Sequence, residues 1–153
     1  MVHRGIATLS GAMMFCFLSL SQFDTTFFFL HFYESMIYLA IILMLFYLED
    51  QWAYMLGMLA PSVWLLLSLA SGVLYGALRQ VVGSEGTHLT GAGMVTLLTA
   101  ILALLMITFC ARHWKREFAG LGVGLRTFFI SLAIVIVYYG ILIYWFGRSF
   151  AWS

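Results

Sequence analysis

The chain has 153 residues, of which 64% are hydrophobic and 8% are charged, and its mean hydropathy is +1.05. Soluble domains carry about 25% charged residues, and a domain of this size would leave much of this apolar surface in contact with water. The formal net charge of +1 gives no basic field that would attract nucleic acid. The composition therefore predicts an integral membrane protein and excludes soluble and nucleic-acid-binding classes.

Five apolar stretches follow one another along the chain. Each reaches or approaches the ~20 residues that an α-helix needs to cross about 30 Å of hydrocarbon. They predict an all-α fold, a polytopic transmembrane helix bundle that forms one integral-membrane domain over residues 1–153. The expected spans are residues 5–21, 25–48, 52–78, 93–110 and 121–146.

The first stretch, residues 5–21, decides between five spans and four. It has only ~17 residues, and its basic start also resembles a signal peptide. If it does not cross, four basic residues on one side face three on the other; if it crosses, the ratio becomes five to two. The positive-inside rule therefore favours five spans, with the N-terminus in the cytoplasm and the C-terminus outside. The five residues on the cytoplasmic side are then Arg4, Arg112, Lys115, Arg116 and Arg126.

A polar stripe lies within the second expected span. His31, Glu34, Ser35 and Tyr38 fall at i, i+3, i+4 and i+7 and so share one helical face. Counted from Thr25, Glu34 lies about 13 Å along the helix, near the middle of the bilayer. An acid at that depth costs on the order of 3 kcal/mol, so we expect its carboxyl group to be protonated, paired or in contact with water. The stripe is either a proton, ion or ligand site, or an interhelical hydrogen-bonded pair that fixes packing.

Two carboxylate–histidine pairs have the same i, i+3 spacing. His31 and Glu34 form one pair, and Glu85 and His88 in the longest loop form the other, on the same side of the expected membrane. Such pairs hold two metal ions when they project from facing helices, although the glycines beside Glu85 favour a loop. His31 is alternatively an axial ligand for a haem or a chlorophyll-type pigment.

Packing signals concentrate in the third expected span. Ser68, Gly72 and Gly76 form a ridge of small residues at four-residue spacing, which predicts a close approach by another helix. Pro61 is the only proline of the chain, and because it removes a backbone donor it predicts a kink near Gly57.

Three function classes remain, and since the chain carries no catalytic motif we expect no enzymatic activity. The first is an accessory or structural subunit of a larger respiratory, photosynthetic or transport complex in an inner, plasma or other energy-transducing membrane. The second is a small oligomeric ion- or proton-coupled transporter or channel that uses Glu34. The third is a haem- or pigment-binding membrane protein with His31 as the ligand. The expected partners are the lipid bilayer and either other membrane subunits or further copies of the chain.

Overall fold

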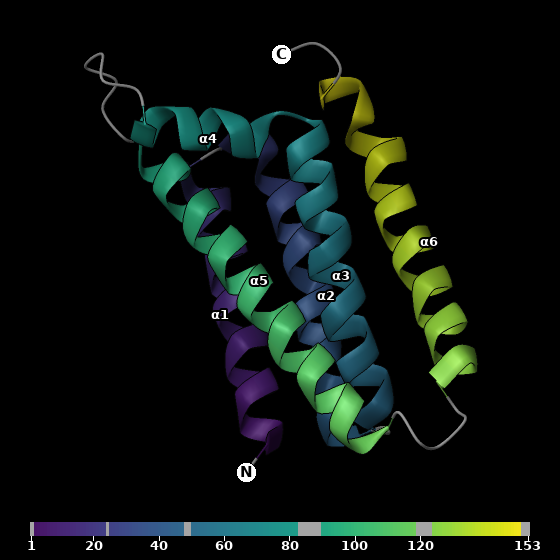
Figure 1. Cartoon of the computed structure of the whole chain (residues 1–153). Coiled ribbons are helices and arrows are strands. Elements are labelled where there is room, and N and C mark those ends of the chain that lie inside the picture. The colour runs from purple at the N-terminus through teal and green to yellow at the C-terminus, as the bar shows by residue number, and fades with distance from the viewer. Residues whose placement is uncertain (1, 24, 48–49, 83–89, 119–123, 151–153) are drawn as a thin grey trace.

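A computed structural model describes residues 2–23, 25–47, 50–82, 90–118 and 124–150, and this part of the chain is helical with no strand. The all-α fold class is therefore confirmed. The helices are α1 (Val2–Phe23), the short 3₁₀ helix η1 (Thr25–Phe27), α2 (Phe28–Tyr47), α3 (Asp50–Ala70), α4 (Val73–Val82), α5 (Gly91–Glu117) and α6 (Gly124–Phe150) (Figure 1).

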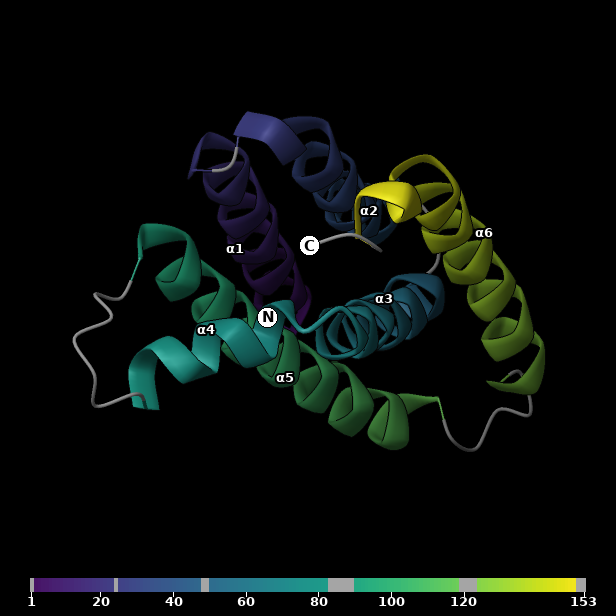
Figure 2. The same ribbon diagram turned by 90° about the horizontal axis from the view of Figure 1, so that it is seen from above.

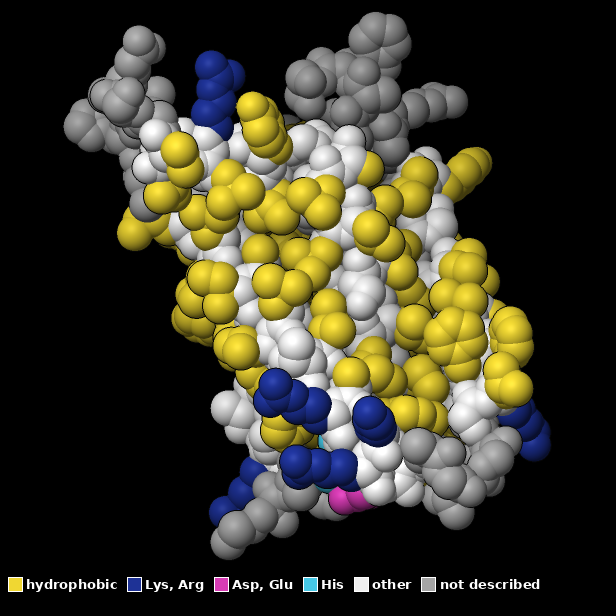
Figure 3. Space-filling view, in the orientation of Figure 1, with side chains coloured by type: hydrophobic (Ala, Val, Ile, Leu, Met, Phe, Trp, Pro, Cys, Tyr) yellow, Lys and Arg dark blue, Asp and Glu magenta, His cyan; other side chains and the backbone are white. Residues whose placement is uncertain are grey.

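Five of these helices, α1, α2, α3, α5 and α6, are long and apolar enough to cross a membrane. The first of them qualifies over Arg4–Phe23, so the described chain supports five spanning helices rather than four. α1 begins and α6 ends at opposite ends of the bundle, as an odd number of crossings requires (Figure 1). Apolar side chains cover the flank of the bundle between these ends (Figure 3), where a lipid bilayer would surround it.

The expected span over residues 52–78 is wrong, because the chain turns within it. α3 ends at Ala70, and Gly72 has a φ of +76°, a left-handed conformation that glycine adopts without a steric penalty. The short helix α4 then lies across the end of the bundle (Figure 1). We call this end of the bundle the α4 end.

The other bounds differ by a few residues. α5 continues from the expected end at Cys110 to Glu117, with Lys115 and Arg116 in its last turn. Basic side chains at a helix C-terminus interact favourably with its dipole, so the polar segment extends the helix instead of ending it. α5 begins at Gly91 because Thr90 caps it: the Thr90 Oγ1 accepts a hydrogen bond from the Gly93 amide over 3.2 Å.

α1, α2, α3 and α5 form the core of the bundle, and α6 packs on its outside, against α3 and α2 (Figure 2). Gly57 marks a close crossing, since a Cβ there would lie 2.9 Å from the Cys110 Sγ and 3.2 Å from the Ile6 Cδ1. The side chains buried at this crossing and along the axis include Met13, Phe17, Ile41, Tyr54, Leu56, Ala103 and Met106.

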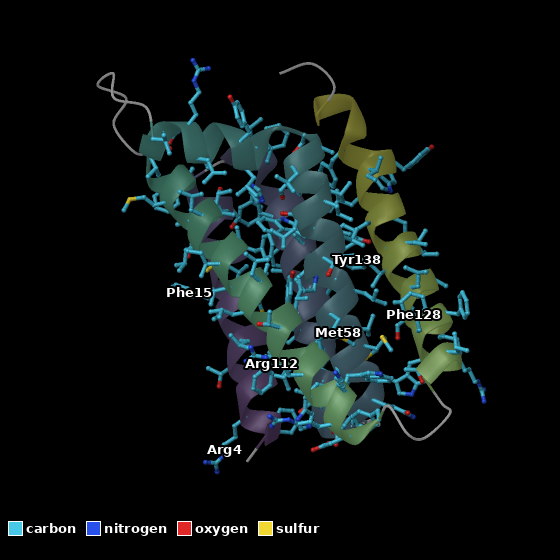
Figure 4. The ribbon with its side chains drawn as sticks, in the orientation of Figure 1. Arg4, Phe15, Met58, Arg112, Phe128 and Tyr138 are labelled. Carbon is cyan, nitrogen blue, oxygen red and sulfur yellow. The ribbon has the colours of Figure 1, made fainter. Side chains whose placement is uncertain are left out.

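Two tyrosines attach α6 to α2. The rings of Tyr33 and Tyr138 stack with centroids 4.4 Å apart. The Tyr33 hydroxyl donates to the Tyr138 carbonyl over 3.1 Å, and the Tyr138 hydroxyl donates to the Tyr33 carbonyl. Figure 4 places Tyr138 between α6 and the rest of the bundle. This reciprocal contact joins two helices that touch little elsewhere.

Basic side chains gather at the end of the bundle opposite α4 (Figure 3). This basic end holds the start of α1, the end of α5 and the start of α6 (Figures 1 and 4). Its basic residues are Arg4, Arg112, Lys115, Arg116 and Arg126, whereas Arg79 lies on α4. The fold thus brings together the five basic residues that a five-span topology assigns to one side of the membrane.

Candidate functional site

A pocket of about 360 Å³ lies at the α4 end of the bundle. All six α-helices contribute to it, and most of the side chains that line it are apolar. The pocket is lined by Leu20, Leu30, His31, Glu34, Trp64, Leu67, Ser68, Ala70, Ser71, Val73, Thr96, Leu142 and Ile143. We call it the α4-end pocket.

The corner between α3 and α4 forms an exposed part of the pocket rim. Ala70, Ser71 and Val73 at this corner are exposed, whereas Glu34 and Trp64, deeper in the pocket, are buried. Gly72 makes the corner possible, so the same left-handed residue that ends α3 also shapes the mouth. A small molecule or water would enter from the α4 end and meet the α2 side chains inside.

His31 and Glu34 meet in this pocket. Three residues apart on α2, they lie on one face, and the His31 Nδ1 is 2.9 Å from the Glu34 Oε2. Their side chains remain 18% and 9% exposed, and both line the pocket. Trp64 of α3 lies within hydrogen-bonding reach of the same carboxyl group. Glu34 is six residues from the start of the 20-residue helix α2, which places it about 5 Å from the midpoint of the helix.

The other two residues of the stripe lie outside the pocket lining. Ser35 is fully buried, and its hydroxyl donates to the Phe32 carbonyl of the same helix over 2.6 Å. Tyr38 is also fully buried, one helical turn beyond Glu34, and its ring stacks on Phe17 with centroids 5.5 Å apart. The structure therefore divides the stripe into a pocket pair and two core residues.

The Tyr38 hydroxyl extends the polar region inward. The Tyr38 hydroxyl faces the hydroxyl of Tyr139 on α6. The Tyr139 hydroxyl donates to the Ala60 carbonyl over 3.2 Å, whereas the Tyr38 hydroxyl makes no hydrogen bond of good geometry. A buried hydroxyl without a partner costs about 1–3 kcal/mol. Such groups are places where a bound water or a functional role is expected.

The residues described by the structure include no group of three or more His, Cys, Asp or Glu side chains that could hold a metal ion. Glu85 and His88, the second pair expected from the sequence, lie outside the described residues. Glu34 engages the Nδ1 of His31 and leaves its Nε2 for a ligand, as second-shell carboxylates do for metal-bound histidines. Among the described lining residues, one imidazole and one carboxyl group are the only His, Cys, Asp or Glu ligands, and three hydroxyls are the other oxygen donors.

The expected small-residue ridge does not exist as one surface. Ser68 lies on α3 and lines the pocket, but Gly72 is in the turn and Gly76 is on α4. A Cβ added at Gly72 or Gly76 would meet no atom within 4 Å, so no helix approaches them in the described structure. The ridge prediction fails because it assumed one continuous helix. Pro61 is buried within α3, which continues to Ala70.

Trp64 and Thr96 line the pocket but are not among the site residues predicted from the sequence. Trp64 carried a signal, because it lies far from any expected helix end while the other four tryptophans lie near one. Thr96 carried none, since threonines within apolar helices commonly donate to their own backbone, as the Thr96 hydroxyl does to the Ala92 carbonyl.

Comparisons with protein-family models, curated proteins and solved structures give no match. The chemistry of the site follows from its own groups. A carboxyl group and an imidazole in contact, with apolar walls around them and an opening on one side, can share a proton and exchange it with whatever enters the pocket.

Proposed function

We propose that this chain is a small integral-membrane subunit of a larger membrane assembly, and that Glu34 and His31 give the assembly a proton-exchanging site reached from the α4 end. The observation that carries the proposal is the pocket itself. A pair that served packing alone would be sealed by neighbouring side chains, but this pair lines a space of about 360 Å³. An acid inside a membrane-spanning helix is costly, which makes it a functional candidate by default.

The close packing of side chains beyond Glu34 favours a role as a subunit over a channel formed by one chain alone. Beyond Glu34, the side chains of Met13, Tyr38, Ile41 and Leu56 are fully buried. The described residues of one chain thus supply a site with a mouth at one end, and a path across the bilayer would need further subunits or further copies. The outward face of α6, with Phe129, Ile136 and Tyr144 exposed, suits lipid or a neighbouring helix.

A second candidate is a small oligomeric proton-coupled transporter. The opening of the pocket at the α4 end supports it, because a transporter that uses Glu34 needs access to that carboxyl group from one side of the membrane. With the basic end in the cytoplasm, this access would be from the outside.

The first test is mild extraction of the protein from its native membrane, followed by sizing, mass identification of co-migrating chains and an absorption spectrum of the same fraction. Co-migration with other membrane subunits is the result expected for an accessory subunit. A colourless homo-oligomer would reject that role and favour the transporter. A visible absorption band that disappears in a His31→Ala variant would favour a bound haem or pigment instead.

A second test addresses the site directly. Infrared difference spectra recorded while the pH is changed should show bands of a carboxyl group, protonated or ionised, that Glu34→Gln removes. The exposed Glu117 at the basic end provides the matched control, since Glu117→Gln makes the same chemical change outside the pocket. A spectrum that Glu34→Gln leaves unchanged would contradict proton exchange at this site.

A further inference from the structure

We infer that the α4-end pocket binds a monovalent organic cation with an apolar body, and that the cation replaces the proton shared by Glu34 and His31. This inference rests on the proton-exchanging site proposed above and names the class of its ligand. Three observations carry it: the charge inside the pocket, the composition of its walls, and the aromatic side chain beside the carboxyl group.

The charge balance selects a cation. Glu34 is the only Asp or Glu among the lining residues that the structure describes, and none of these is Lys or Arg. With one proton, the Glu34–His31 pair is neutral as a whole; without it, the pair carries one negative charge in a largely apolar space. An isolated charge of that kind is unfavourable. A bound cation cancels it, a neutral ligand does not, and an anion would make the imbalance worse.

The walls select an organic cation over a metal ion. Na⁺, Mg²⁺ or Ca²⁺ exchange their water shell for several oxygen ligands. In this pocket the described lining offers such an ion only one carboxyl group and the hydroxyls of Ser68, Ser71 and Thr96, and leucine, isoleucine, valine and alanine form most of the remaining surface. A cation whose charge is covered by methyl or methylene groups loses less hydration and contacts these walls favourably.

Trp64 adds a further element of cation recognition. It lines the pocket beside Glu34, so a cation in contact with the carboxyl group can also lie against the indole ring. The faces of aromatic rings attract cations, and tryptophan does so most strongly. The volume of about 360 Å³ fits a ligand with one ring or a short branched body.

Several groups face Glu34 and determine what the pH dependence reports. His31 and Tyr38 face it from α2, and Tyr138 and Tyr139 face it from α6. α1, α3, α4 and α5 contribute no Asp, Glu, Lys, Arg or His to the described lining. His31 is thus the basic partner of Glu34, and the exchange is balanced: one cation enters, one proton leaves for the water at the mouth, and the net charge of the pocket does not change.

The experiment is isothermal titration of the full-length protein in lipid nanodiscs with benzyltrimethylammonium. This probe has no ionisable proton, so every proton released comes from the protein. Titrations in two buffers of different ionisation enthalpy count those protons. Neopentylbenzene, in which a neutral carbon replaces the charged nitrogen, is the matched neutral control.

The expected result is binding by the unmodified protein with release of about one proton. In the pH range where the pair carries its proton, the Kd should decrease about tenfold for each pH unit of increase. Glu34→Gln should weaken binding at least tenfold, and Glu117→Gln should leave it unchanged. Neopentylbenzene should bind at least tenfold more weakly than the cation. In case Glu34→Gln fails to fold, Ala70→Trp narrows the mouth with Glu34 intact and should also weaken binding.

Equal affinity of the unmodified protein and Glu34→Gln, equal affinity for the neutral control, or binding without proton release would each overturn the inference. So would the absence of binding. In that last case the infrared measurement separates the two proposals: carboxyl bands that depend on Glu34 and change with pH would leave the proton-exchanging site standing without an organic-cation ligand, and their absence would remove both.

Discussion

The carboxyl group of Glu34 and the imidazole of His31 depend on each other at the residue scale. The 2.9 Å contact gives each a partner in a poorly hydrated place. Glutamine at position 34 keeps a hydrogen-bonding group for His31, whereas leucine leaves the imidazole without one. We therefore expect Glu34→Leu to lower the free energy of unfolding by about 1 kcal/mol more than Glu34→Gln does.

Reversible unfolding in mixed micelles, followed by circular dichroism, measures this difference. Glu117→Gln and Glu117→Leu at the basic end serve as the matched pair, because the Glu117 side chain is 51% exposed. Equal and negligible effects of both substitutions at position 34 would show that the pair contributes nothing to stability.

Tyr38 and Tyr139 make a second comparison at this scale. The Tyr38 hydroxyl is buried without a good hydrogen bond, whereas that of Tyr139 donates to the Ala60 carbonyl. Removing an unsatisfied hydroxyl relieves a desolvation cost, so Tyr38→Phe should raise the free energy of unfolding by about 1 kcal/mol. Tyr139→Phe should lower it by a similar amount. If both substitutions destabilise the protein equally, the Tyr38 hydroxyl holds a water molecule or a ligand.

At the element scale, the direction of helix α4 depends on the backbone conformation of Gly72. Gly72 has a φ of +76°, where a Cβ costs roughly 1 kcal/mol. Gly72→Ala should therefore destabilise the corner and loosen α4, even though a Cβ there meets no other atom within 4 Å. Gly76→Ala is the control: it adds the same atom into open space within a helix, where alanine is favoured by up to about 1 kcal/mol.

Limited proteolysis after Arg79 measures this effect, because a protease cleaves that bond only when the helix around it has locally unfolded. Faster cleavage of Gly72→Ala and unchanged or slower cleavage of Gly76→Ala are the expected results. Equal rates for both variants would mean that contacts of α4 with the bundle, such as those of Leu74 and Ala77, determine the corner without help from Gly72.

The elements could be predicted from the sequence where one physical signal dominated. Long apolar runs identify the membrane-spanning helices, because the bilayer requires that length. The same signal misses the end of α3, because residues 71–78 carry no charge and remain apolar enough to extend the run, and only Ser71 and Gly72 mark the break. It also misses the last two turns of α5, where charged side chains reach the membrane surface without leaving the helix.

The candidate site was predictable only in part, for a related reason. His31 and Glu34 are neighbours because of helical spacing, which the sequence contains directly. Trp64, Thr96 and Leu142 join them from three other helices, and that meeting depends on how the helices pack. Ser35 fits the same helical spacing but does not line the pocket, because its side chain is buried in the core of the bundle.

The five basic residues at one end make the whole molecule electrically asymmetric. With this end in the cytoplasm, a cysteine at the exposed position Gln22 near the α4 end should react with a membrane-impermeant thiol reagent added to intact cells. A cysteine in place of Glu117 at the basic end should react only after permeabilisation. Cys16 and Cys110 are buried and should not interfere. The opposite labelling pattern would reverse the orientation and place the pocket mouth in the cytoplasm.

The peripheral position of α6 has a consequence for the pocket (Figure 2). Among the described helices, α6 packs chiefly against α3 and less against α2, and it supplies Leu142 and Ile143 to the pocket wall. We therefore expect this wall to move outward more readily than the four core helices do, restrained by the stacked rings of Tyr33 and Tyr138. We expect a larger ligand to gain room by displacing this one peripheral helix toward the lipid, and not by opening the close-packed centre of the bundle.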